Sequence, residues 1–291
     1  MLVTILDVLL AGLLLGGIYA LIAMGLSLQY GVARVFNVAH GEFIMIGAMV
    51  TWTFYTIVGI NPLLSAVISG PVIFVIGFFL YHTLFRYLRT KSITHAAFES
   101  NSMLAAFGLL FIIQNIALII PRWGSEIRGY TYLASPVNIG GAIFAANRLV
   151  TLLVAVVIGL AFYLFLMRTR MGKAIRAAAQ DAITARLMGI NINLVLALCF
   201  GLGALMAGLA GVLISMCYPI HATMGLEYTI IAIIVIVLGG LGNIPGSFLG
   251  GFILGLVGSV VTYFEPGLAL VAYYLIFMLL LILRPAGIIG K

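Results

Sequence analysis

The sequence predicts an all-α protein, a polytopic transmembrane helical bundle of about eight or nine spans with one helix on the cytoplasmic surface. The first observation is composition: of 291 residues, 64% are hydrophobic and 7% are charged, whereas soluble domains carry about 25% charged residues. The second is that apolar residues form runs of roughly the ~20 residues that a spanning helix needs. The third is that lysine and arginine gather at the ends of these runs. Together they exclude a soluble fold, because a soluble surface needs charge.

Nine apolar runs follow one another along the chain. They cover residues 8–29, 43–58, 63–85, 103–120, 149–167, 194–216, 230–238, 248–261 and 268–283. The run 230–238 is short for a full span, so an even number of spans requires it to be re-entrant or not to cross. Pro285 closes the last run. No polar stretch is long enough for a soluble domain, so we expect one transmembrane domain over residues 1–291.

The first run holds Gly12 and Gly16 at a spacing that lets helices approach closely. Asp7 is the first charged residue, and no basic segment precedes the run. We therefore expect this run to be a retained span rather than a cleaved signal peptide.

The basic residues orient the bundle, because positive residues favour the cytoplasmic side of a membrane. The net charge of +7 follows this pattern, which gives no reason to expect a nucleic-acid partner. The residues expected on the cytoplasmic side are Arg86, Arg89, Lys91, Arg168, Arg170, Lys173, Arg176, Arg186, Arg284 and Lys291. Only Arg122, Arg128 and Arg148 fall on the other side. We predict that segment 168–193 and the C-terminus are cytoplasmic and that the loop 122–148 is outside.

Polar residues between the first two runs form the first candidate site. Asn37, His40 and Glu42 occupy a break in apolarity and the start of the second span. Ionisable groups at membrane depth are expensive unless they face a cavity or one another, so these residues are candidates for lining or gating a pathway. The alternative is that His40 and Glu42 lie at the interface and cap the helix, where a glutamate favours the dipole. Glu227 is either an outer-surface residue or a further pathway residue.

A charged segment of about 170–190 is the second candidate. Its middle, 174–188, is rich in helix formers, and Gly189 is a natural helix stop. Apolar residues recur at helical spacing at positions 175, 178, 179, 182, 183 and 187. The pattern predicts one amphipathic helix, which either docks on a partner or lies in the interface as an ordinary surface helix.

Glycines between residues 239 and 251 form the third candidate. Gly242, Gly246 and Gly250 fall four residues apart and predict a smooth helix-packing face. Such glycine density at membrane depth indicates a broken helix, a tight turn or close packing, and we favour a cytoplasmic turn with tight packing.

The sequence contains no recognisable catalytic motif. The chain lacks the glycine-rich phosphate loop followed by Lys-Ser/Thr, an HExxH motif and a CxxC motif. Cys199 and Cys217 lie in one apolar stretch and are expected to be packing residues. We therefore expect no enzymatic activity, no bound cofactor and no metal site in this chain.

Three segments together resemble the permease family of branched-chain amino-acid ABC importers, the LivH/LivM type. They are 25–42, which includes Asn-Val-Ala-His-Gly-Glu, then 176–190 and 239–251. The segment ending in Glu42 is closer to the LivH side of the pair. Val38 stands where we expect phenylalanine in many relatives. The three segments extend over most of the chain in the family's order.

The resemblance implies a single transmembrane permease domain over 1–291 that works with other chains. These are a second, LivM-like permease subunit that forms a heterodimer with this chain, two cytoplasmic ATP-binding subunits that carry the ATP, and a periplasmic solute-binding protein that binds at the loop 122–148. The bilayer is that of a bacterial inner membrane. The implied ATPase-coupling residues are Arg170, Gly172, Lys173, Arg176, Ala179, Asp181, Arg186 and Gly189.

Two alternatives remain at this point. Look-alike permeases of the same family carry urea or short amides, and one sequence does not rank these cargoes. An ion-coupled secondary transporter would use Glu42 as its relay and would need no ATPase.

Overall fold

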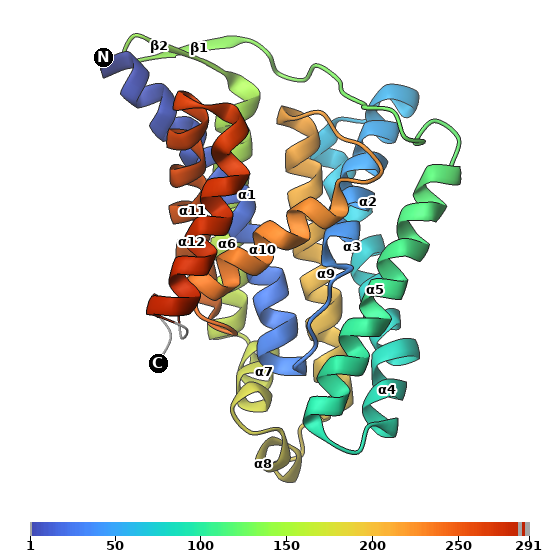
Figure 1. Ribbon diagram of the computed structural model, residues 1–291. Coiled ribbons are helices and arrows are strands. Elements are labelled where there is room, and N and C mark those ends of the chain that lie inside the picture. The colour runs from blue at the N-terminus through green and yellow to red at the C-terminus, as the bar shows by residue number, and fades with distance from the viewer. Residues whose placement is uncertain (1, 285–286, 289–291) are drawn as a thin grey trace.

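The computed structural model describes residues 2–284 and 287–288, and it is almost entirely helical (Figure 1). Pro285 and Lys291, which were expected at the cytoplasmic end, lie outside the described residues. The helices are α1 (Leu2–Ala33), α2 (His40–Thr53), α3 (Pro62–Leu80), α4 (Arg86–Lys91), α5 (His95–Ile119), α6 (Ala146–Arg168), α7 (Arg170–Gln180), α8 (Ala182–Leu187), α9 (Ile192–Cys217), α10 (Gly225–Gly239), α11 (Ile244–Phe264) and α12 (Ala269–Leu283). A π-helical turn, Phe54–Val58, extends α2, and another, Tyr81–Phe85, joins α3 to α4.

Among the described residues, eight helices are long and apolar enough to cross a membrane. Helix α10 is not one of them, because its 15 residues extend only about 22 Å against a hydrocarbon core of about 30 Å. The short run 230–238 therefore belongs to a helix that does not cross by itself. The count of eight agrees with the lower of the two predicted span numbers.

The helices differ in how deeply they lie in the bundle. In the most apolar window of α9, 78% of residues are buried, whereas the corresponding share for the last span is 6%. Figure 1 shows α9 and α10 near the middle, with α5 at one edge and α12 at the other. Residues near the centre are thus covered by protein, and the outer helices present apolar side chains for lipid.

Small residues bring α1 and α11 into direct backbone contact. A Cβ atom added at Gly255 would lie 2.2 Å from the Gly16 nitrogen, and one added at Gly12 would lie 2.8 Å from the Leu256 Cα. Backbones approach this closely in membranes where glycine leaves room. The prediction of close approach through Gly12 and Gly16 is confirmed.

A hairpin in the loop 122–148 was not predicted. Strand β1 (Pro136–Ile139) pairs antiparallel with β2 (Ala142–Ala145). The two linking residues, Gly140 and Gly141, have φ angles of 61° and 90°, and paired positive φ angles match the tight turns that two-residue hairpins favour. The Gly-Gly pair was the available sequence signal. Figure 1 shows this hairpin at the end of the molecule where α1 begins.

Candidate functional site

A buried, non-helical segment connects α1 to α2. Arg34 turns the chain with a φ of 55°, and residues 34–37 then continue without helical structure while Val35 and Asn37 are fully buried. Irregular backbone at membrane depth is tolerated where protein surrounds it. Here Asn37 Nδ2 donates to Gln29 Oε1 at 3.2 Å, and Gln29 Nε2 donates to the Phe200 carbonyl at 3.2 Å. The amide side chains thus tie the segment to α1 and α9.

The helices α2 and α10 meet start to start at what we call the α2–α10 junction, made of Gly41, Glu42, Gly225 and Thr229. The Gly41 backbone N–H donates to Thr229 Oγ1 at 2.8 Å. The Thr229 hydroxyl lies 3.1 Å from the carbonyl of Val38 and 3.1 Å from that of Gly225. A Cβ atom at Gly41 would lie 1.8 Å from the Gly225 oxygen. Only glycine therefore allows the two helix starts to touch.

His40 and Glu42 face the interior of the bundle. His40 is fully buried, and its Nε2 lies 3.1 Å from the Ile22 carbonyl oxygen. Because a carbonyl oxygen only accepts hydrogen bonds, this contact is a hydrogen bond when Nε2 carries the proton. Glu42 is 1% exposed, and neither carboxylate oxygen has a hydrogen-bond partner in the part of the chain that the structure describes. These positions favour the interior alternative over a place at the interface.

The Glu42 carboxylate lies where two helix dipoles begin. It occupies the first turn of α2, and a Cβ atom on Gly225, the first residue of α10, would lie 2.3 Å from Glu42 Oε1. The N-terminus of a helix carries a positive partial charge that favours an anion. A buried carboxylate without hydrogen bonds is nevertheless costly, and ionisable residues inside membranes mark functional positions. The junction is therefore the first candidate site.

Thr229 is the functional candidate that the sequence did not reveal. It is 1% exposed and holds the junction together, but a single threonine in an apolar run carries no pattern. Glu227 lies in the same turn of α10, yet its side chain is exposed in this chain. The structure thus places Glu227 on the surface, apart from the buried side chains of Asn37, His40 and Glu42.

The segment 170–190 contains two helices, α7 and α8, so the prediction of one continuous helix over 174–188 is wrong. Asp181 adopts an extended conformation with φ −151° and caps α8. Its carboxylate accepts a hydrogen bond from the Thr184 hydroxyl and from the backbone N–H groups of Ile183 and Thr184. These bonds, led by the one from the Thr184 hydroxyl, lower the pKa of Asp181. A side chain that bonds the backbone in this way competes with helix continuation.

The break at Asp181 separates the predicted apolar face into two parts. Ile175 and Ala178 of α7 are buried against the bundle, whereas Ile183 and Leu187 of α8 are 77% and 82% exposed. Gly189, two residues after the end of α8, has a φ of 84°, which is typical of a glycine that stops a helix. The segment therefore has an anchored half and an exposed half.

Seven of the eight predicted coupling residues are exposed: Arg170, Lys173, Arg176, Ala179, Asp181, Arg186 and Gly189. Gly172 is buried, and a Cβ atom there would lie 2.3 Å from the Leu166 carbonyl oxygen. Gly172 thus lets α7 fold back on the end of α6 and offers no surface to a partner.

The glycine-rich segment is a tight turn followed by close packing. Gly246 and Gly250 lie on α11 and contact α10 through Gly239. Gly242 lies in the turn before α11 with a φ of 78°, and its close neighbour is Gly31 of α1. The prediction of one helical face is therefore wrong for Gly242, because the helix begins only at Ile244.

At the other end of the bundle, the loop 122–148 packs against α2, α9 and the connection between α9 and α10. Arg128 and Ile220 exchange backbone hydrogen bonds of 2.7 and 2.8 Å. Tyr130 Oη lies 3.0 Å from Ser215 Oγ. Arg128 pairs with Glu126 at 2.9 Å and lies over the Trp52 ring. These contacts fix the loop over the C-terminal ends of α2 and α9.

The arrangement defines a polytopic α-helical membrane protein of the transport class, since helix N-termini that meet inside the bundle are a feature of transporter binding sites. A family model described as the permease component of the branched-chain amino acid transport system matches residues 8–284. The chain belongs to this family of permease components.

Curated relatives agree with the family. The chain is 31% identical to the high-affinity branched-chain amino acid transport system permease protein BraD of Pseudomonas aeruginosa, over 96% of this chain and 94% of that protein. It is equally similar to LivH of Salmonella typhimurium, with 31% identity over 96% and 94% of the two chains. A probable LivH of Methanocaldococcus jannaschii is 29% identical over 93% and 88%. These relatives favour a permease component over the ion-coupled secondary transporter.

Proposed function

We propose that this chain is one of two membrane-spanning subunits of an ATP-driven importer of branched-chain amino acids. The substrate class is the one that the descriptions of its relatives give. The observation that carries the ATP-driven mechanism is the exposed apolar end of α8, where Ile183, Leu187 and Met188 are 77%, 82% and 79% exposed.

An apolar end on a charged, non-spanning segment is suited to a protein partner. Figure 1 shows α8 below the ends of the spanning helices, so lipid tails do not explain its exposed side chains. Clustered exposed apolar residues mark interaction sites on proteins, and the surrounding arginines favour a cytoplasmic position for this end. We infer that an ATP-binding subunit covers α8 and that α7, buried against the bundle, transmits its movement.

The remaining parts of the importer follow from this assignment. A second permease, LivM-like, pairs with this chain, and a periplasmic binding protein delivers the solute to the loop 122–148. Two ATP-binding subunits hold and hydrolyse the ATP. The chain lies in a bacterial inner membrane with its C-terminus in the cytoplasm. The α2–α10 junction, with Asn37, His40 and Glu42 beside it, lines or gates the route of the solute.

The test is to purify the complex and measure ATP hydrolysis in liposomes with the binding protein present. Leucine, isoleucine or valine is expected to stimulate hydrolysis and to be taken up, whereas urea and acetamide are not. Stimulation by urea or acetamide alone would change the substrate class. Uptake by this chain without an ATP-binding subunit would refute the mechanism.

A matched pair of variants tests the docking surface. Leu187→Asp is expected to lose the ATP-binding subunit during purification, because a charge would replace a buried apolar contact. Ile127→Asp is the control, since Ile127 is 73% exposed but lies in the loop 122–148 at the other end. Retention of the ATP-binding subunit by both variants would show that α8 is not the docking surface.

A further inference from the structure

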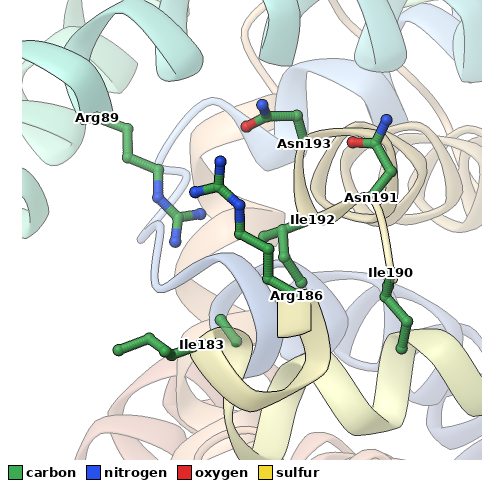
Figure 2. A pocket seen from close by; sticks show the side chains of 8 residues that line it. Arg89, Ile183, Arg186, Ile190, Asn191, Ile192 and Asn193 are labelled. Atoms are coloured by element: carbon green, nitrogen blue, oxygen red, sulfur yellow. The ribbon is translucent and has the colours of Figure 1, made fainter. Parts of the chain in front are cut away.

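A basic cavity of about 480 Å³ lies beside α8 (Figure 2). We call it the arginine groove, and its principal lining residues are Arg89, Ile183, Arg186, Ile190, Asn191 and Asn193. Arg89 comes from α4, at the cytoplasmic end of the continuous helical span Pro62–Lys91. Arg186 comes from α8, so the groove joins a spanning helix to the cytoplasmic segment. Arg89 also lines a neighbouring cavity of about 610 Å³ with Arg34.

The groove has two cations and lacks a counter-charge. Figure 2 shows the guanidinium groups of Arg89 and Arg186 extending from different elements into the same space. Within residues 2–284 and 287–288, the one ion pair is that of Arg128 with Glu126, on the other side of the bundle. Asp181 is near, but its oxygens accept the bonds that cap α8. Two positive charges that face one cavity repel each other, and an anion bound between them offsets this repulsion by attracting both.

The chemistry of the lining favours a carboxylate. Guanidinium groups bind carboxylates through paired, charge-assisted hydrogen bonds. Asn191 accepts a bond from the Leu194 N–H through Oδ1, which leaves its NH₂ group as a donor, since an amide side chain carries two N–H donors. The groove is also continuous with the exposed Ile183 of α8, below the ends of the spanning helices. A protein surface can present apolar contacts and a carboxylate together at this position.

We propose that the arginine groove receives an aspartate or glutamate side chain of the ATP-binding subunit, held between Arg89 and Arg186. This inference rests on the proposed function. It gives the ATP-binding subunit a second connection to the bundle, through α4 and the span that packs on α9, in addition to the anchored helix α7. The coupling surface then includes Arg89, which lies 81 residues before Arg170, the first residue of the coupling segment.

Zero-length cross-linking identifies the carboxylate. In the intact complex, the Arg89→Lys variant is treated with a carbodiimide, which activates a carboxylate so that the lysine amine forms an amide bond and the activated oxygen leaves with the urea. Mass spectrometry is expected to find Lys at position 89 joined to an acidic residue of the ATP-binding subunit. Arg86→Lys is the control, because Arg86 lies on the same helix, is exposed and does not line the groove.

Charge reversal measures the contribution. Arg89→Glu is expected to weaken binding of the purified ATP-binding subunit about tenfold or more, and Arg86→Glu is expected to change it less than threefold. Lysine in place of the cross-linked acidic residue of the ATP-binding subunit is expected to restore binding to Arg89→Glu. Unchanged binding by Arg89→Glu, or equal cross-linking from positions 86 and 89, would overturn the inference.

Two outcomes separate this inference from the proposed function. If the unaltered chain binds no ATP-binding subunit, the proposed function fails. If it binds one that Arg89→Glu binds equally well, only the groove assignment fails. Native mass spectrometry in phosphatidylglycerol nanodiscs tests for a lipid headgroup instead: loss of a retained anionic lipid in Arg89→Glu, with unchanged subunit binding, would assign the groove to lipid and overturn the proposal.

Discussion

Replacing Gly41 by alanine puts one methyl group into the α2–α10 junction. The added Cβ atom would lie 1.8 Å from the Gly225 oxygen and 2.4 Å from Thr229 Oγ1. Real Cβ contacts essentially never fall under 3.0 Å, so the contact must open by at least 1.2 Å, from 1.8 to 3.0 Å. The obstructing atom is backbone, so a side-chain rotation does not relieve the clash.

The cost has two parts. Overpacking a close-packed interior costs about 1–3 kcal/mol. Separating the helices also breaks the bond from the Gly41 N–H to Thr229 Oγ1, 2.8 Å long, and a hydrogen bond contributes roughly 0.5–1.5 kcal/mol. We expect a destabilisation of roughly 2–4 kcal/mol, with loss of transport because the junction can no longer close.

The assay is thermal unfolding of the detergent-purified chain, followed by size-exclusion chromatography, together with substrate-stimulated ATP hydrolysis of the complex. Gly108→Ala is the control, since Gly108 lies inside α5 with no atom within 4 Å of an added Cβ. This variant should unfold at or slightly above the temperature of the unaltered chain, because alanine favours a helix over glycine. Equal unfolding temperatures for the two variants would refute the packing argument at the junction.

Three further changes test the same reasoning elsewhere. Thr229→Val keeps the shape of the side chain but leaves the Gly41 N–H buried without its acceptor, and we expect a loss of about 1–3 kcal/mol in the same unfolding assay. Gly255→Ala, whose Cβ would lie 2.2 Å from the Gly16 nitrogen, should separate α1 from α11 and lower the yield of folded chain. The lowered pKa of Asp181 means that its cap on α8 is present above the ordinary aspartate pKa of about 3.9 and is lost as pH falls through the lower value; the protection of α8 amides against hydrogen exchange, corrected for the pH dependence of intrinsic exchange, should therefore fall only below about pH 4.

Each of these has its own control. Thr229→Ser keeps the hydroxyl, so it should retain most of the stability that valine loses. Gly267→Ala, with its nearest atom at 3.9 Å, should fold normally. Asp181→Asn retains a capping side chain but no titrating group, so the protection of its α8 amides should not change with pH in the acid range. A valine variant as stable as the serine variant would contradict the assignment of Thr229. Protection of the α8 amides in Asp181→Asn that falls with acid as in the unaltered chain would contradict the assignment of Asp181.

The candidate site was partly visible in the sequence. Asn37, His40 and Glu42 stood out because polar groups interrupt an apolar pattern, and that signal depends on composition alone. Thr229 and Arg89 did not stand out. Their importance comes from neighbours far along the chain, Gly41 and Arg186, and no local spacing reports a contact over that distance.

The sequence by itself determined that the chain crosses the membrane repeatedly and where the charged segment lies, and it marked the run 230–238 as short for a full span. These features follow from the cost of placing charge and unpaired backbone in lipid. This cost applies to each segment separately, so the local sequence is enough to assess it. The tertiary structure decided the rest. It set the break at Asp181, which turns Ile183 outward, because a side-chain cap competes with helix propensity. It removed Gly242 from the packing face and brought Gly41 onto Gly225, because close approach is a property of two segments together.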